Sequence, residues 1–329
     1  MKKLSIILIV LAVALFAAGC KDSKTDKVTI GISKIVSHPA LDSVEKGIQD
    51  QLKEEGYTNI TFDLQNANGE ISTAASIAQK FKADKVNIAV GIATPTAQAL
   101  TNTIKDAVVI YSAVTDPVDA GLVKSFTAGE KNVAGVSDMT PVKDQIVFLK
   151  KLKDVKRLGH IYASHEANAV TLAKMAKNAC QELGIEFVES TVTNSSEVKQ
   201  AAQSIAGRVD AFYLSTDNTV ISALAAVADV AKANKLPIMS ADPSSAEKYE
   251  VFAAWGFDYY KMGKATGKLI SRILKGEKAE SIPTIFMTDP SDVDLLINLD
   301  VAKKLGITIP DDMVKKASRV VKDGKMTKK

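Results

Sequence analysis

Residues 87–100, Asn-Ile-Ala-Val-Gly-Ile-Ala-Thr-Pro-Thr-Ala-Gln-Ala-Leu, are the stretch that decides the fold. Their pattern predicts a buried strand over 86–92 that runs directly into a helix. Thr94 is a candidate N-cap of that helix, and Pro95 suits the first helical position, where its missing N–H costs nothing. The loop therefore presents free N–H groups and hydroxyls at the carboxyl end of a strand. Open α/β sheets bind ligands there, and a helix N-terminus favours an anion such as a carboxylate.

Short β-branched runs alternate with amphipathic helical segments on both sides of this stretch. In the first half, the expected strands are 28–33, 60–66, 86–92 and 108–113, and the expected helices are 39–55, 70–81 and 95–104. This βαβαβαβ order predicts a parallel, doubly wound sheet with right-handed crossovers.

A second series of the same kind begins after residues 138–141. Its expected helices are 142–152, 167–183, 196–206 and 218–233, and its expected strands are 157–163, 185–191, 209–215 and 237–240. The loop at 213–218 corresponds to the one at 91–96, and the turn at 240–243 corresponds to 112–117. Matching turns at matching places predict two Rossmann-like lobes whose strand ends face each other across a cleft.

The C-terminal part is expected to pass between the lobes again. We assign residues 28–140 and 256–284 to lobe 1, 141–255 and 285–315 to lobe 2, and 316–329 to a solvated basic tail. A strand ending near Gly256, a helix over 261–274, a last strand over 282–287 and a closing helix over 292–305 are expected. Gly263 and Gly267 suggest close packing against lobe 1, since each glycine costs a helix about 1 kcal/mol relative to alanine.

The first 19 residues are typical of a secretory signal peptide, because a basic start, an apolar run and small residues follow one another. The Cys after Ala-Gly resembles the lipobox of bacterial lipoproteins. On this interpretation Cys20 becomes the lipidated N-terminus, held at the cell membrane by two or more acyl chains, and 20–27 is a tether. Ordinary cleavage beside a coincidental Cys is the alternative.

Composition argues against several classes of protein. Three His without a Cys or His cluster predict no metal site, and a lone Cys180 in an apolar helix predicts a buried side chain without a disulfide. The net charge is +4, and the basic tail lacks interleaved aromatics, so no nucleic-acid partner is expected. Enzyme motifs are absent from the sequence, so no catalysis and no cofactor are predicted. His165 and Glu166 are adjacent and point in different directions, which disfavours an acid–base pair.

Taken together, the lipobox, the paired lobes and four segments carry a family resemblance. The segments are Gly-Ile-Ala-Thr-Pro-Thr-Ala-Gln-Ala (91–99), Val-Thr-Asp-Pro-Val-Asp-Ala-Gly-Leu-Val (114–123), Ser-Thr-Asp-Asn-Thr-Val (215–220) and Gly-Phe-Asp-Tyr-Tyr-Lys-Met-Gly (256–263). The chain resembles the substrate-binding lipoproteins of ABC importers, most closely their tryptophan/tyrosine-binding branch. The resemblance implies a monomer with three chain crossings between its lobes, hinge closure on an aromatic amino acid, and a membrane permease as partner.

A zwitterionic ligand needs donors for its carboxylate and acceptors for its ammonium group. We predict Thr94 and Thr96 for the carboxylate, Ser164 and Asn168 as a clamp from lobe 2, and Asp217 for the ammonium. The remaining candidates, at the ends of equivalent strands, are Thr115, Asp116, Thr216 and Asp242. Each has a plain structural alternative, a helix cap for Thr94 and Asp217 and an Asp-Pro turn for Asp116 and Asp242. Four aromatic residues on strands are candidates for contact with an aromatic side chain of the ligand: Tyr111, Tyr213, Trp255 and Phe257.

Two other functions share this fold. One is a sensor lipoprotein that presents its ligand to a receptor, and it would differ only in partner. The other is a nucleoside- or sugar-binding lipoprotein, which requires carboxylates and aromatics that bracket a ring.

Overall fold

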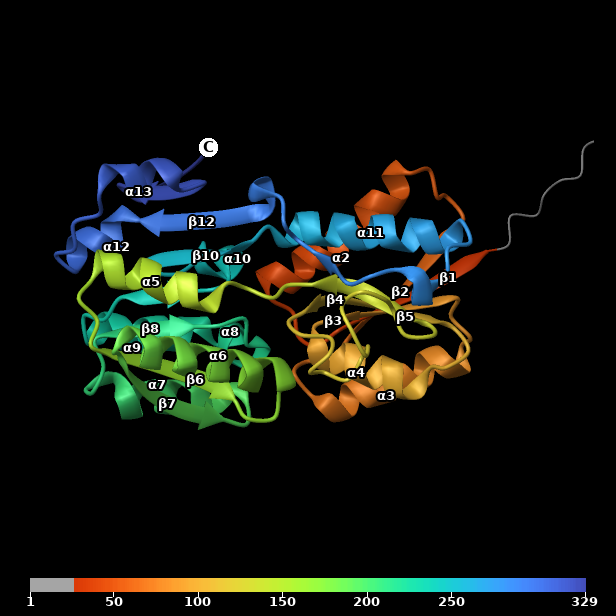
Figure 1. Cartoon of the computed structure of the whole chain (residues 1–329), viewed down its shortest axis with the longest axis horizontal. Coiled ribbons are helices and arrows are strands. Elements are labelled where there is room, and N and C mark those ends of the chain that lie inside the picture. Colours follow the sequence, from red (N-terminus) through yellow and green to blue (C-terminus); the bar gives the residue numbers. More distant parts are fainter. Residues whose placement is uncertain (1–26) are drawn as a thin grey trace, which may run out of the picture.

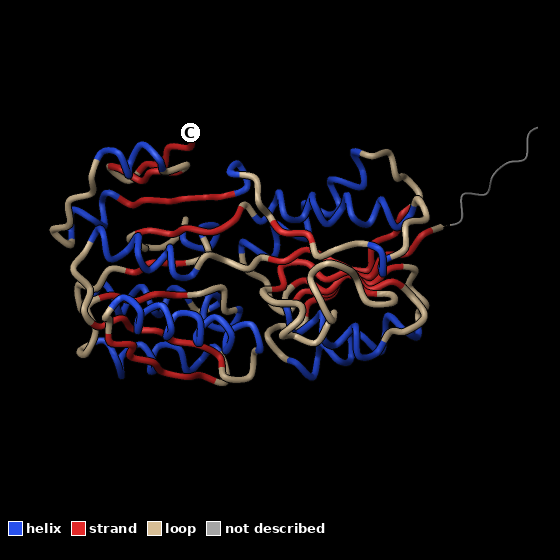
Figure 2. The backbone as a smooth tube through the Cα atoms, viewed as in Figure 1, coloured by secondary structure: helices blue, strands red, loops and turns tan. Residues whose placement is uncertain are grey.

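The computed structural model describes residues 27–329, which form two lobes side by side (Figure 1). The expected signal peptide, Cys20 and all of the tether except Lys27 lie outside the described residues. Each lobe is built on its own sheet, one with six described strands and one with eight. Figure 2 shows the strands of the two sheets separated by a few connecting segments.

The sheet of lobe 1 is entirely parallel and has the order β11-β5-β4-β3-β1-β2. Its strands are β1 (Val28–Lys34), β2 (Ile60–Asn66), β3 (Ile88–Ile92), β4 (Val108–Val114), β5 (Val133–Ser137) and β11 (Ile285–Phe286). Its helices are α2 (Pro39–Glu54), α3 (Ile71–Ala83), α4 (Thr94–Thr103) and α11 (Tyr259–Leu274). Helices α2 and α11 cover one face and α3 and α4 the other (Figure 1), as expected of a doubly wound sheet.

The sheet of lobe 2 has the order β14-β13-β12-β10-β9-β8-β6-β7. Its strands are β6 (Arg157–Ala163), β7 (Glu186–Val192), β8 (Ala211–Leu214), β9 (Ile238–Ser240), β10 (Ala253–Phe257), β12 (Val293–Asn298), β13 (Arg319–Lys322) and β14 (Lys325–Lys328). Its helices are α5 (Val142–Leu152), α6 (Ala167–Leu183), α7 (Val198–Ala206), α8 (Asn218–Ser222), α9 (Leu224–Ala233), α10 (Pro243–Ala246), α12 (Leu299–Lys304) and α13 (Asp311–Lys316).

Buried residues of β8 alternate between the two cores of this lobe. Phe212 and Leu214 pack with α7 and α9, whereas Tyr213 packs with α5 and α6. The period of two in the strand therefore buries both faces of the sheet. The prediction of two α/β lobes with parallel sheets is confirmed, and at one edge of the lobe 2 sheet β12 lies antiparallel to β10 and β14 antiparallel to β13.

Within the described chain, the backbone passes between the lobes three times, at residues 138–141, at Asp258 and at residues 287–292. The short 3-10 turns η1 (Ser195–Glu197), η2 (Ala279–Ser281) and η3 (Pro290–Asp292) lie in connections, and η3 belongs to the third crossing.

Three expectations about the C-terminal part are wrong. β11 pairs with β5 in lobe 1, although residues 285–315 were assigned to lobe 2, and all of β10 belongs to lobe 2. Residues 293–298 form β12 instead of a helix, because their apolar positions bury a strand against β10 and only the six residues of α12 are helical. The supposed tail contains β13 and β14, which extend the sheet because Val320 and Ala317 are buried.

Helix α11 lies along α2 at very short range. A Cβ at Gly47 would be 2.3 Å from the carbonyl oxygen of Tyr260, and one at Gly263 would be 2.2 Å from that of Val44. Both glycines are needed because the two backbones nearly touch. This contact confirms the close packing expected from Gly263 and Gly267.

Candidate functional site

The carboxyl ends of the central strands of both sheets meet at the boundary between the lobes. A small inner cavity of about 20 Å³ lies there, which is enough space for one water-sized group. Its lining on the lobe 1 side, with the first and second crossings, consists of His38, Leu41, Ala113, Thr115, Asp138 and Tyr259. Its lining from lobe 2 consists of Asn168, Thr216, Asp217, Asn218, Ile221 and Asp242.

The wall from lobe 1 is shaped by two strained turns. Ala93, which follows β3, has φ of 77°, and Ala113 near the end of β4 has φ of 54°. A non-glycine residue in the left-handed region costs about 1–3 kcal/mol, and such strain concentrates at functional sites. The register of β3 and β4 pairs Ile92 with Ser112, so both turns lie at the same sheet edge.

The two threonines at the start of α4 behave differently from each other. The N-cap is Ala93, so Thr94 does not cap the helix, and its buried hydroxyl has no partner among the described residues. The Thr96 hydroxyl donates to the carbonyl oxygens of Ile92 at 2.7 Å and Ala93 at 3.0 Å. The structure therefore brings Thr94 to the sheet edge as a free donor, whereas it engages Thr96 inside the helix, against the prediction.

The wall from lobe 2 combines capping with free polar atoms. Asp217 is fully buried and caps α8, and its oxygens accept from Val220 N at 2.9 Å and Ala163 N at 2.6 Å. Asn168 donates to the carbonyl oxygen of Thr216 at 3.2 Å. The Asn168 Oδ1 and the Thr216 hydroxyl have no partner among the described residues. Both atoms therefore remain open to a ligand.

Thr94 and Thr96 do not line the inner cavity, and two further predicted residues also lie elsewhere. Ser164 is exposed, and its hydroxyl is 3.5 Å from the carbonyl oxygen of Val192. Asp116 accepts from the backbone N–H groups of Val118 and Asp119, both at 2.9 Å, and shapes a turn as its Asp-Pro alternative requires. Neither residue lines the inner cavity.

Carboxylates dominate the inner cavity. Asp138, Asp217 and Asp242 all line it, and its described lining contains no Lys or Arg. Burial raises the pKa of Asp138 to about 6, and burial together with the nearby Glu166 carboxylate raises the pKa of Asp217. Buried carboxylates without a cation are costly, so this cavity favours a positively charged group from outside.

Asp242 is the carboxylate best placed to meet such a group. It caps α10, where Oδ1 accepts from Ser244 N and Ser245 N, and Oδ2 accepts from the Ser245 hydroxyl at 2.6 Å. Its Oδ2 is also 3.9 Å from His38 Nδ1 across the boundary between the lobes. Burial lowers the pKa of His38, so this imidazole is a poor permanent partner.

Several residues of the inner cavity escaped the sequence analysis. Tyr259 donates to Asp138 Oδ2 at 3.0 Å, and His38 precedes the first turn of α2. Both stand immediately before or at the start of a helix, a position that the chain uses at every wall of the cavity. A polar residue at or just before the start of a helix was therefore the sequence signal that could have identified them.

The aromatic residues predicted to contact the ligand do not line the inner cavity. The Tyr213 hydroxyl donates to Gln145 at 2.6 Å, and the Tyr111 hydroxyl lies 2.7 Å from that of Thr284. Trp255 packs edge-on against Phe148, and Phe257 belongs to the core of lobe 1. All four therefore have structural contacts in the described chain, which is the more frequent role of an aromatic residue on a strand.

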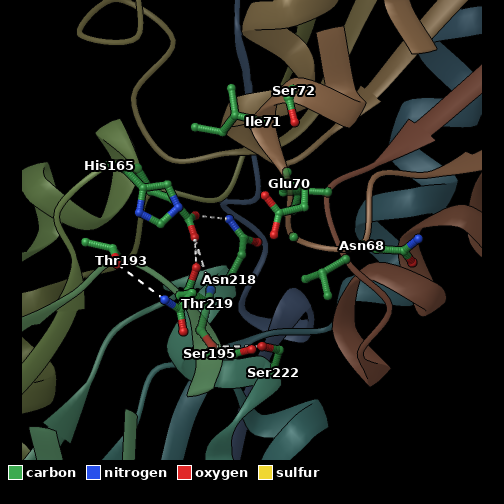
Figure 3. Close-up of a pocket in the computed structure, with 15 residues that line it drawn as sticks. Asn68, Glu70, Ile71, Ser72, His165, Thr193, Ser195, Asn218, Thr219 and Ser222 are labelled. Atoms are coloured by element: carbon green, nitrogen blue, oxygen red, sulfur yellow. Dashed lines mark hydrogen bonds between the residues drawn. The ribbon is translucent and has the colours of Figure 1, made fainter. Parts of the chain in front are cut away.

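A second, larger space, the outer chamber, continues the site toward the surface. It has a volume of about 220 Å³ and is lined by Ile35, Val36, Asn68, Gly69, Glu70, Ile71, Ser72, His165, Glu166, Thr193, Asn194, Ser195, Asn218, Thr219 and Ser222 (Figure 3). Asn218 lines both spaces. Glu166 is buried and accepts hydrogen bonds from Asn218 Nδ2 and from Thr219 N at 3.0 Å.

The chain belongs to the ABC transporter substrate binding protein family, whose model matches residues 29–321. It is thus a substrate-binding protein with a ligand cleft between two lobes. One relative is the "Tyrosine-binding protein" of Clostridioides difficile (strain R20291), 38% identical over 288 residues that cover 86% of this chain and 82% of the relative.

Two solved structures are similar at nearly the same identity. The ABC domain in complex with L-Trp from Streptococcus pneumonia is 35% identical with a TM-score of 0.85, and the match covers 90% of this chain and 100% of that one. The ligand-free, open structure of a substrate binding protein with adhesive properties from Clostridium difficile is 36% identical with a TM-score of 0.67, covering 90% and 99%. The lobes of the present chain are therefore arranged as in the L-Trp complex.

Two contacts join the lobes across the mouth of the cleft. The Thr171 hydroxyl of α6 donates to Asp119 of lobe 1, and His38 faces Asp242.

In the part of the chain that the structure describes, no helix combines the length and apolar character needed to cross a membrane.

Ligand affinity should fall in acid. A bound ammonium group requires an ionised carboxylate, and the raised pKa of Asp138, about 6, lets protons compete below that pH. One obligatory ionisation gives a loss of up to about tenfold per pH unit. Calorimetric titrations between pH 5 and pH 7.5 should show this slope, and Asp138→Asn should flatten it.

The free protein should respond with the opposite sign. The native state holds the Asp138 proton more tightly than the unfolded chain does. The contribution of this group to the free energy of unfolding is therefore full below about pH 4 and is lost as pH rises through 6. If ligand affinity still falls in acid in Asp138→Asn, the group whose protonation weakens binding is not Asp138.

Proposed function

We propose that this substrate-binding protein binds an aromatic α-amino acid, tyrosine or tryptophan, between its lobes and delivers it to a membrane permease. The observation that carries the proposal is the charge of the inner cavity. Three buried carboxylates line it without Lys or Arg in the described lining, and an α-ammonium group supplies the missing cation.

The carboxylate of the ligand also has candidate hydrogen-bond donors in lobe 1. The free hydroxyl of Thr94 lies at the N-terminus of α4, where helix N–H groups favour a carboxylate. Thr115 lies at the same sheet edge and lines the cavity. An amino acid held by Asp242 from lobe 2 and by Thr115 from lobe 1 bridges the lobes, and contacts made only in the closed form shift the population toward it.

The aromatic character of the ligand is supported by the names of the relatives. One is called tyrosine-binding, and another is solved with L-Trp. The outer chamber adds apolar surface from Ile35, Val36 and Ile71, against which a ring can lie. Together these support an aromatic amino acid over a small polar one.

Anchoring and partner are parts of the same proposal. Lipidation of Cys20 would hold the protein on the extracytoplasmic face of the membrane, close to its permease. A sensor that presents the same ligand to a receptor is the rival interpretation. Uptake of labelled ligand by cells lacking the protein separates the two, because loss of uptake indicates import and normal uptake indicates sensing.

A thermal-shift screen of the soluble protein against the amino acids, with nucleosides and sugars included, tests the ligand class. Tyrosine or tryptophan should raise the melting temperature most, because a ligand that binds only the native state stabilises it by mass action. Calorimetry then gives the affinity. Stabilisation by a nucleoside or a sugar in place of any amino acid would overturn the proposal.

A further inference from the structure

The outer chamber is where a ligand anchored in the inner cavity must extend. The two spaces meet at Asn218, and both are lined from both lobes. The inner cavity contributes charged and polar groups suited to an ammonium and a carboxylate. The side chain of an amino acid held there points into the larger, outer space, so that space decides which side chain is accepted.

The walls of the outer chamber differ in character. Lobe 1 contributes aliphatic side chains, of which Ile35 is buried and Ile71 is 44% exposed at the mouth. Lobe 2 contributes hydroxyl and amide groups from residues 193–195 and from Ser222. A flat ring with one polar edge fits such a space, because its face packs on the aliphatic wall while its edge meets polar atoms.

The charges of the chamber are acidic. Glu70 and Glu166 line it, and its described lining contains no Lys or Arg. The Glu166 carboxylate is engaged by Asn218 and Thr219. Glu70 differs, because it is exposed, its carboxylate has no hydrogen bond or ion pair within the described chain, and it does not cap α3 with its side chain. Figure 3 shows the Glu70 side chain extending from lobe 1 toward Asn218 across the chamber.

We propose that Glu70 selects the ligand's ring by accepting a hydrogen bond from a donor on its edge, the phenol O–H of tyrosine or the indole N–H of tryptophan. Phenylalanine has the same aromatic face without a donor, so it gains no hydrogen bond with this carboxylate. A hydrogen bond to a charged group is stronger than one between neutral groups, which makes the discrimination measurable even at a partly open chamber. The inference rests on the proposed amino-acid function and names the specificity residue within it.

Calorimetric affinities for tyrosine, tryptophan and phenylalanine test the inference. The unaltered protein should bind tyrosine or tryptophan about tenfold or more tightly than phenylalanine. Glu70→Ala should weaken that preferred ligand about tenfold and leave phenylalanine nearly unchanged. Glu70→Gln keeps an acceptor oxygen without the charge, so it should give a smaller loss. Ser76→Ala, further along α3 and outside the lining of both spaces, is the control and should leave all three affinities unchanged.

The outcomes are separable. An equal loss for all three ligands, or no loss, in Glu70→Ala would overturn the role of Glu70 while leaving amino-acid binding in place. Tighter binding of arginine or lysine than of tyrosine would show that the acidic chamber accepts a second cation, which would also overturn it. Failure of the unaltered protein to bind any amino acid would count against the proposed function itself.

Discussion

Asp242→Asn should weaken amino-acid binding by at least about 100-fold, or roughly 3 kcal/mol, without unfolding the protein. Truncating or neutralising one member of a buried charge pair typically costs 2–5 kcal/mol. Asparagine is as good an N-cap as aspartate, so the backbone N–H groups of Ser244 and Ser245 keep their acceptor. The lost affinity therefore measures the charge that faces the ligand, and calorimetry with the preferred amino acid reports it.

Asp116→Asn is the matched control for this experiment. Asp116 occupies the equivalent turn of lobe 1, after the fourth strand, and its Oδ1 likewise accepts from two backbone N–H groups. It does not line the inner cavity, so affinity should change less than twofold. Unchanged affinity in Asp242→Asn would transfer the ammonium contact to Asp217 or Asp138.

Gly263→Val should lower the free energy of unfolding by about 3 kcal/mol, at the upper end of the cost of overpacking. Its Cβ would lie 2.2 Å from the Val44 carbonyl oxygen and 2.9 Å from the Gly47 Cα, and neither backbone atom can move aside alone. The helices α2 and α11 must then separate. Since His38, Leu41 and Tyr259 at their N-termini line the inner cavity, affinity should fall as well.

Urea unfolding followed by circular dichroism measures this loss. Gly207→Ala is the control, because Gly207 ends α7 with φ of −74° and nothing lies within 4 Å of an added Cβ. Its free energy of unfolding should stay within about 0.5 kcal/mol of the parent. Equal stability of Gly263→Val and the parent would mean that the two helices are less tightly packed than described.

Local signals were sufficient to predict most of the fold. Strand and helix periods, with glycines after helices, identified the alternating elements of both lobes, and Gly263 indicated a close helix contact. The helix predicted over residues 292–305 is wrong because the apolar spacing of this segment suits both a helix and a strand. Only the pairing of β12 with β10 decides between the two. β13 and β14 were missed because the lysines of residues 316–329 resemble those of a solvated tail, although Arg319 is buried between Glu247 and Asp294.

The sequence indicated which strand ends form the candidate site, but not which side-chain atoms there are free to contact a ligand. The strand ends that carry Thr94, Thr115, Asp217 and Asp242 were recognised from matching turns. Whether a hydroxyl is free or engaged depends on its position in the first turn of the helix, as the contrast between Thr94 and Thr96 shows. His38, Glu70 and Asp138 come to the site through tertiary structure, which no local pattern reports.

Lobe 1 is discontinuous along the chain, because α11 and β11 come from residues 259–286, beyond most of lobe 2. When a nascent chain has been synthesised only as far as β5, helix α2 does not yet have α11 packed against Gly47, and the sheet lacks its edge strand β11. The first lobe reaches its finished structure only after most of the second has been synthesised. For the same reason, the two lobes are not interchangeable modules, and recombination between relatives must exchange two separated segments to preserve one lobe.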